Sequence, residues 1–171
     1  MRNNLDWRRS PLRRSEGKRR RSRPTRSAPR AYGGSGRVRL GSDVRRDGTC
    51  LFRSVLYLLT RDEAVREHAD VTAFRNKVID GIPDTDAVLV QVNHDGTGHQ
   101  QYRSVADYKR YMRSHRFAWG GGAELLSMCR LFDVCIHVYD AVHASWIVHG
   151  HADDHRHLHL YYEDQCHYRP M

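Results

Sequence analysis

The chain has 171 residues, a formal net charge of +9 and four cysteines, a length that suits one domain with a tail. Residues 1–40 contain 14 of the 29 basic residues and only 2 of the 20 acidic ones, so the overall charge does not describe the mildly acidic remainder. The cysteines form no Cys-x-x-Cys pair and no apolar run reaches roughly 18 residues, which argues against a zinc finger, a disulfide framework and a membrane span.

The first segment, residues 1–37, is rich in Arg, Ser, Pro and Gly. It cannot bury enough surface to offset chain entropy, so we predict a disordered basic tail ahead of a folded domain at residues 38–171. The cluster from Lys18 to Arg23 suits nuclear import or contact with nucleic-acid phosphates, and a solvated linker is the plainer interpretation. The N-terminus lacks the apolar segment of a secretion signal and the cysteines fit a reducing compartment, so we expect an intracellular protein, cytoplasmic or nuclear.

Helical patterns open the domain. Apolar residues from Leu51 to Leu59 recur at helical spacing, which predicts a helix that starts at or just after Cys50. In a later helical stretch, Ser104 and Asp107 stand in capping-box positions. The helical stretches after the first are residues 62–83, 104–112 and 123–132.

The last third changes to short apolar and alternating runs, which predict strands at residues 133–139, 144–150 and 157–163. His167 follows a polar turn and begins a further short strand. Helices first and strands later indicate an α+β domain with a small sheet packed on helices.

Cys50 stands between the turn residues Asp47 to Thr49 and the predicted helix. A thiol is nucleophilic as thiolate, and a helix N-terminus or a nearby imidazolium lowers its pKa. We expect Gly48 to adopt backbone angles closed to other residues, and free N–H groups at the turn to receive an oxyanion. The base that such a thiol requires is expected among the 12 histidines, with His167 favoured by its place after a turn.

These segments resemble the ovarian-tumour (OTU) family of cysteine proteases. The matching stretches are "DGTCLFRSV", "DYKRYM", "WGGGAELLSM", "DVCIHVY", "HLHLYY" and "CHY", in the order of the family and at roughly its intervals. The resemblance covers about residues 40–170 and implies a papain-like fold with a small mixed sheet packed between helices. It implies a thiol protease that removes ubiquitin or a ubiquitin-like modifier and needs no cofactor or metal. We expect it to act as a monomer.

The resemblance also assigns roles to residues. Cys50 matches the nucleophile, His167 the general base, and Asp47 the acidic residue of the turn that shapes the oxyanion hole, with Gly48 and Thr49 in the same turn. The N–H of Cys50 is expected to be one oxyanion donor. The positions expected to support the site or contact substrate are Trp119, Gly120, Gly121 and Glu124.

One departure from the family concerns the residue two positions after the histidine. Many members have Asp or Asn there to orient the imidazole, whereas this chain has Arg169, which cannot accept the imidazole N–H. The orienting role is therefore expected to fall to Asp47, to another acceptor or to none, with Asp43 and Asp164 as lesser candidates. Loss of such a carboxylate slows acyl transfer by orders of magnitude without abolishing it.

A histidine-rich segment near the C-terminus offers a metal site as an alternative use of its side chains. His149, His151, His155, His157 and His159 lie close to Asp153 and Asp154, and histidines at alternate strand positions share a face. The plainer interpretation is a polar hairpin with solvent-facing histidines, and we adopt it.

Two functions from different classes remain. The first is a deubiquitinase that hydrolyses the bond after the modifier's C-terminal glycine. The second is a weakly active or inactive ubiquitin-binding module, tethered to nucleic acid by its basic tail. Arg169 favours the second and the intact turn before Cys50 favours the first. The compact domain and the Arg-rich leader would suit a viral protein.

Overall fold

The computed structural model describes residues 40–95, 101–151, 153 and 156–171. The predicted tail at residues 1–37 lies outside the described residues, so its disorder and its nucleic-acid or nuclear-import contacts stay predictions. The helices are α1 Cys50–Thr60, α2 Ala64–Glu67, α3 Thr72–Asp80, α4 Asp86–Asp95, α5 Val105–Ser114 and α6 Gly122–Phe132. The strands are β1 Val134–Asp140, β2 Ser145–His149, β3 Arg156–Glu163 and β4 His167–Pro170.

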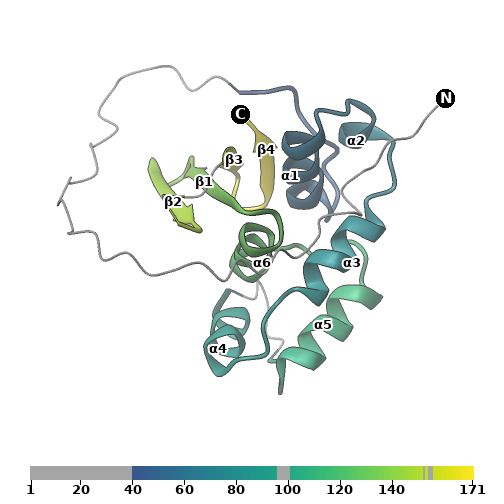
Figure 1. The fold of residues 1–171 in the computed structure, drawn as a ribbon, viewed down its shortest axis with the longest axis vertical. Helices are drawn as coiled ribbons and strands as arrows, with labels where there is room; N and C mark the ends of the chain where they lie inside the picture. The colour runs from purple at the N-terminus through teal and green to yellow at the C-terminus, as the bar shows by residue number, and fades with distance from the viewer. Residues whose placement is uncertain (1–39, 96–100, 152, 154–155) are drawn as a thin grey trace, which may run out of the picture. The chain divides into compact units, whose positions relative to one another are not determined.

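The four strands form one mixed sheet in the order β2-β1-β3-β4 (Figure 1). β1 and β3 are parallel, and both outer strands are antiparallel to their neighbours. α1 packs beside β4, and α6 leads directly into β1, so the sheet lies against helices as an α+β fold. This architecture confirms the predicted fold class.

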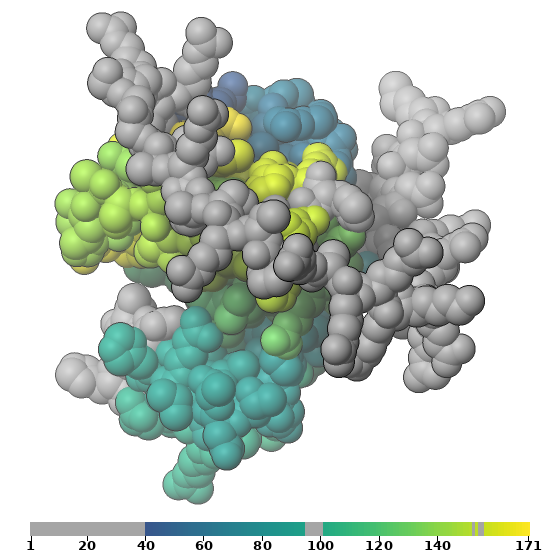
Figure 2. Space-filling view, turned by 60° about the vertical axis from the view of Figure 1, so that its left-hand side comes forward, coloured from purple at the N-terminus to yellow at the C-terminus, as the bar shows by residue number. Residues whose placement is uncertain are grey.

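Alternation along the strands places one face of the sheet in the core. Ile136, Val138, Leu158 and Leu160 are buried on that face, where they meet the apolar sides of α1 and α6. A second apolar cluster joins α3, α4, α5 and α6 and includes Ile79. Figure 2 shows the α4 and α5 segments, in teal, on one side of the described domain and the strands, in green to yellow, on the other.

The helix boundaries agree with the sequence pattern at α1, α5 and α6. α1 begins at Cys50, and the Ser104 side chain caps α5 by accepting the N–H of Asp107 at 3.1 Å. The prediction of one helical stretch at residues 62–83 was wrong in one respect, because this stretch forms two helices, α2 and α3. Asp70 accepts the N–H of Thr72 at 2.9 Å and so restarts the helix.

α4 was not predicted. Val88 and Val92, four residues apart, bury one face of this helix against the second apolar cluster, while Val90 is exposed. Across the described residues no helix combines the length and the apolarity that crossing a bilayer requires.

Candidate active site

Cys50 is the first residue of α1 and is held by the turn before it. Asp47 organises this turn, because its Oδ1 accepts the backbone N–H of Thr49 at 2.9 Å and the Thr49 hydroxyl. The N–H of Cys50 donates to the carbonyl oxygen of Asp47 at 3.1 Å. Cys50 N–H is thus engaged in the turn, and the oxyanion donor predicted there is not free in this structure.

Gly48 is required for a different reason from the one predicted. A Cβ atom at Gly48 would lie 1.6 Å from the carbonyl oxygen of Phe117, so no other residue fits. Among the described residues the glycine with a positive φ is Gly150, so Gly48 does not use the backbone freedom that the sequence suggested for it. A close approach between two backbone segments imposes glycine here.

Arg53 is a buried support of this turn that the sequence interpretation missed. One helical turn after Cys50, its Nε donates to the Thr49 hydroxyl at 3.0 Å and its Nη1 donates to the Val65 carbonyl at 2.8 Å. Its Nη2 lies 3.8 Å from Oδ2 of Asp47. The available signal in the sequence for this role was a charged residue in a largely apolar helix, four positions after the threonine of the turn.

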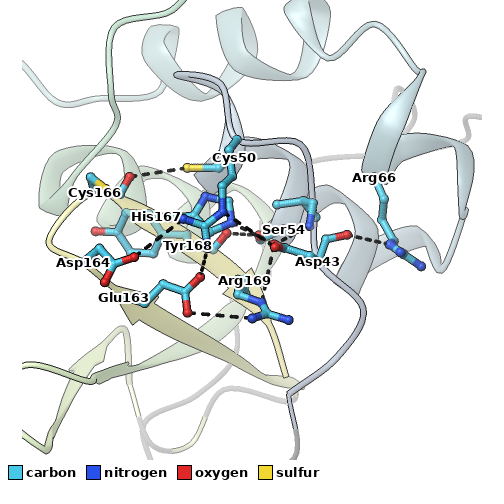
Figure 3. A network of polar contacts seen from close by, with 12 residues as sticks. Asp43, Cys50, Ser54, Arg66, Glu163, Asp164, Cys166, His167, Tyr168 and Arg169 are labelled. Atoms are coloured by element: carbon cyan, nitrogen blue, oxygen red, sulfur yellow. Dashed lines mark hydrogen bonds and ion pairs between the residues drawn. The ribbon is translucent and has the colours of Figure 1, made fainter.

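His167 reaches Cys50 through the antiparallel pairing of β4 with β3, in which His167 stands opposite Glu163. Both neighbours of His167 contact α1. The Cys166 carbonyl lies 3.9 Å from Sγ of Cys50, and the Tyr168 carbonyl accepts the Ser54 hydroxyl at 3.0 Å. The structure therefore packs the segment that carries His167 against the start of α1, and His167 itself is buried, at 2% exposure (Figure 3).

Asp43 contacts the imidazole. Its Oδ1 lies 2.8 Å from Nε2 of His167, whereas Asp47 makes its contacts within the turn and with arginines. A carboxylate accepts, so Nε2 carries the proton and Nδ1 keeps its lone pair. The geometry assigns the orienting position to Asp43, a lesser candidate from the sequence, in place of Asp47.

Arg169 stands beside this carboxylate. Its Nε lies 3.4 Å from Oδ1 of Asp43, and its Nη1 lies 3.7 Å from Oε2 of Glu163. Partial burial raises the pKa of Asp43, but the His167 contact, the Val44 N–H and the charge of Arg169 together lower it below its ordinary value. The arginine at the family's acidic position thus helps to keep a carboxylate from elsewhere ionised.

The thiol of Cys50 differs from the expected thiolate. Cys50 is 5% exposed, and this burial raises the pKa of its thiol, with Asp47 and Cys166 adding to the effect. The N–H groups of Tyr168 and Leu51 lower the pKa only partly. Sγ points to the Cys166 carbonyl, and no hydrogen bond joins it to His167, both residues being described. Desolvation outweighs the helix N-terminus, and the direction of the shift favours the protonated thiol over the expected thiolate.

Cys50 opens onto a cleft of about 760 Å³ whose lining includes Trp119, Gly120, Gly121 and Cys166. Trp119 is 51% exposed on the cleft rather than packed as structural support. Gly120 packs tightly on α1, since a Cβ there would lie 3.0 Å from Leu51 Cδ2. A Cβ at Gly121 would meet nothing within 4 Å.

Glu124 holds the segment of Gly120 and Gly121 in place through hydrogen bonds. It is fully buried, accepts the Tyr108 hydroxyl at 2.6 Å and accepts the Gly121 N–H at 2.8 Å. Burial raises the pKa of Glu124. Arg75 supports the same segment by donating to the Ala118 carbonyl at 3.1 Å. These contacts place Glu124 in the packing beneath the cleft rather than on its surface.

The model of the OTU-like cysteine protease family matches residues 45–168, which is well over half of the chain. The chain belongs to the OTU-like cysteine proteases. No curated protein matches it.

Solved OTU structures share the fold. The OTU domain of OTUD1 is 21% identical, with a TM-score of 0.53 over 75% of this chain and 82% of that one. An OTU deubiquitinase from Wolbachia pipientis wMel bound to ubiquitin is 17% identical, with a TM-score of 0.52 over 77% of this chain and 93% of that one. The viral OTU protease from Farallon virus is 14% identical, with a TM-score of 0.51 over 75% of this chain and 80% of that one. At these identities the likeness shows the fold alone, and a viral source stays a prediction.

Proposed function

We propose that this OTU protease is a deubiquitinase that uses Cys50 as nucleophile, His167 as general base and Asp43 as the group that positions the imidazole. The observation that carries the proposal is the contact of 2.8 Å between His167 and Asp43, next to a cysteine at a helix start. This is the arrangement of nucleophile, base and orienting acceptor that acyl transfer by a thiol requires.

The proposed reaction starts with a rotation of the Cys50 side chain from the Cys166 carbonyl toward Nδ1 of His167. Nδ1 takes the thiol proton, and Sγ attacks the carbonyl carbon of the modifier's C-terminal glycine. The imidazolium then protonates the leaving amine as the carbon–nitrogen bond breaks, which leaves a thioester. Water then gives a proton to His167 while its oxygen attacks the thioester carbon, the carbon–sulfur bond breaks, and the modifier leaves with a free C-terminal carboxyl group. Sγ takes the proton back from the imidazolium, which restores the thiol.

The oxyanion is proposed to bind at the turn before Cys50. The N–H groups of Thr49 and Cys50 are used by Asp47, whereas that of Gly48 has no acceptor among the described residues. We therefore assign Gly48 N–H as a donor to the oxyanion, in place of Cys50 N–H.

The proposed substrate is a ubiquitin or ubiquitin-like conjugate. The cleft at Cys50 presents Gly120 and Gly121 on one side and the exposed indole of Trp119, which suits a narrow tail ending in glycines. The proposal extends to this chain what the structure from Wolbachia pipientis wMel is described as binding.

The alternative is a ubiquitin-binding module with weak or no activity, and the raised thiol pKa and the missing Cys50–His167 hydrogen bond favour it. A ubiquitin probe with a C-terminal electrophile separates the two. Covalent labelling of the full chain but not of Cys50→Ala supports the enzyme. Ubiquitin binding without labelling supports the module.

The same probe tests the assigned residues. His167→Ala is expected to abolish labelling at neutral pH, because nothing else described beside the thiol takes its proton. Cleavage of a panel of di-ubiquitins then establishes the linkage that the enzyme prefers. Cleavage of another modifier but of no di-ubiquitin would refute ubiquitin as substrate while leaving the protease activity intact.

A further inference from the structure

The sheet carries a group of metal-ligand side chains on the face opposite the core. The parallel register of β1 and β3 pairs Cys135 with His157 and His137 with His159. Paired residues of neighbouring strands share a face, as do residues two apart in one strand. These four side chains therefore form a two-by-two patch, and the core-facing Leu158 points the other way.

Three donor atoms of this patch converge. Sγ of Cys135 lies 3.4 Å from Nε2 of His137, which lies 2.9 Å from Nδ1 of His157. All three atoms lie within 4.8 Å of one another. In a tetrahedral zinc site, bonds of about 2.3 Å to sulfur and 2.0–2.1 Å to nitrogen separate the ligand atoms by roughly 3.3–3.6 Å. Small rotations of the side chains suffice to reach that spacing.

We propose that Cys135, His137 and His157 bind one Zn²⁺ ion, with water in the fourth position. One thiolate and two imidazoles are a ligand set that Zn²⁺ favours over the hard cations Mg²⁺ and Ca²⁺. Binding removes the thiol proton of Cys135 to solvent, and each histidine directs the lone pair of a neutral ring to the ion.

The surroundings of His137 hold its ring in place. The ring of His159 stacks on it with centroids 4.8 Å apart, and the edge of Trp146 faces it at 6.5 Å. Cys135 is buried and His157 is exposed, so the proposed site has a buried thiol at its base and is open to solvent on the side of His157.

The ion would join β1 to β3 at a place separate from the cleft of Cys50, so the inference does not depend on the proposed function. Because the three ligands meet only through the parallel strand pairing, zinc would bind the folded chain and not the unfolded one in this geometry. Zn²⁺ is therefore expected to raise the unfolding temperature of the protein.

The test is a titration of the full chain carrying Cys50→Ala, which removes the competing thiol of the active site. Co²⁺ serves as a spectroscopic probe, since a thiolate ligand adds a charge-transfer band in the near ultraviolet. One equivalent of Co²⁺ is expected to give this band, and Zn²⁺ is expected to displace it. A second group of possible ligands, Asp43, Glu163 and His167, contains no thiol and so cannot produce the band.

Three variants in the Cys50→Ala background decide the outcome. Cys135→Ser is expected to lose the band, and His157→Ala to weaken Co²⁺ binding at least tenfold, while His68→Ala, an exposed histidine outside the patch, leaves binding unchanged. His157 is exposed, so its variant is expected to fold even if the buried Cys135→Ser does not, and circular dichroism checks both. Absence of the band in the parent, or His157→Ala binding as tightly as the parent, refutes the site.

Discussion

Nε2 of His167 lies 2.8 Å from Oδ1 of Asp43, a residue 124 positions earlier in the chain. The contact joins the segment before α1 to β4. Between these two segments in the chain order lies Cys50, the nucleophile that we propose. Arg169, at the position where many OTU proteases carry the orienting acid, lies 3.4 Å from the same carboxylate oxygen. In this chain the carboxylate beside the imidazole therefore comes from the segment before α1, and an arginine of β4 lies next to it.

The first prediction concerns the orienting carboxylate. Asp43→Ala is expected to lower kcat by roughly 10²–10⁴-fold with little change in KM, because it removes the acceptor that orients the imidazole. Asp43→Glu, which keeps the charge, is expected to restore part of the rate. Hydrolysis of a ubiquitin C-terminal fluorogenic substrate measures both parameters.

Asp164→Ala is the matched control for this prediction. Its side chain is exposed and its contact, at 3.6 Å, is with Arg46. Full activity of Asp43→Ala together with loss of activity in Asp164→Ala would show that the orienting group had been assigned wrongly.

The second prediction is the pH dependence of the thiol. Because burial raises the pKa of Cys50, the fold favours the protonated form, and the thiolate fraction at neutral pH lies below that of free cysteine. The rate of alkylation by iodoacetamide is expected to climb as pH rises, with an apparent pKa above that of free cysteine. A rate already constant from pH 6 upward would instead indicate a preformed thiolate–imidazolium pair.

The third prediction compares two glycines of the cleft. Gly48→Ala is expected to misfold or lose activity, because its Cβ would overlap the carbonyl oxygen of Phe117. Gly121→Ala is expected to fold with unchanged stability, since a Cβ there meets nothing within 4 Å. Thermal unfolding followed by circular dichroism compares the variants with the parent, and a stable Gly48→Ala would contradict the packing described here.

The fourth prediction separates a residue that supports the segment of Gly120 and Gly121 from a residue expected to contact substrate. Glu124→Ala leaves the buried Tyr108 hydroxyl and the Gly121 N–H without their acceptor, which is expected to cost about 3 kcal/mol and lower Tm by about 10 °C. Differential scanning calorimetry measures this loss.

The exposed Trp119 provides the counterpart to Glu124. Trp119→Ala is expected to leave Tm unchanged and to raise KM for ubiquitin substrates, because its indole lies on the cleft rather than in the core. A fall in Tm with unchanged KM would return Trp119 to the structural role inferred from the sequence.

The local features of the site could be predicted because they depend on neighbours in the chain. The periodicity after Cys50 placed the helix start, Ser104 marked the start of α5, and the family motifs singled out His167. Each rests on a short stretch in which spacing alone determines backbone hydrogen bonding or exposure.

The long-range features could not be predicted in the same way. Asp43, Asp47 and Asp164 are each close in sequence to Cys50 or His167, the proposed catalytic pair, and nothing in their spacing says which carboxylate meets the imidazole. The packing of β4 against α1 decides this by bringing Asp43 to Nε2. The same holds for Gly48, whose need for glycine comes from Phe117, a residue far along the chain.

The sequence by itself determined the helix start at the thiol, the α+β order of elements and the family. Only the tertiary structure decided the burial of Cys50, which carboxylate contacts His167 and the pairing of Cys135 with His157. The physical reason is that burial and strand pairing are properties of the packed chain. A thiol's desolvation and a carboxylate's partner depend on segments that arrive from more than a hundred residues away.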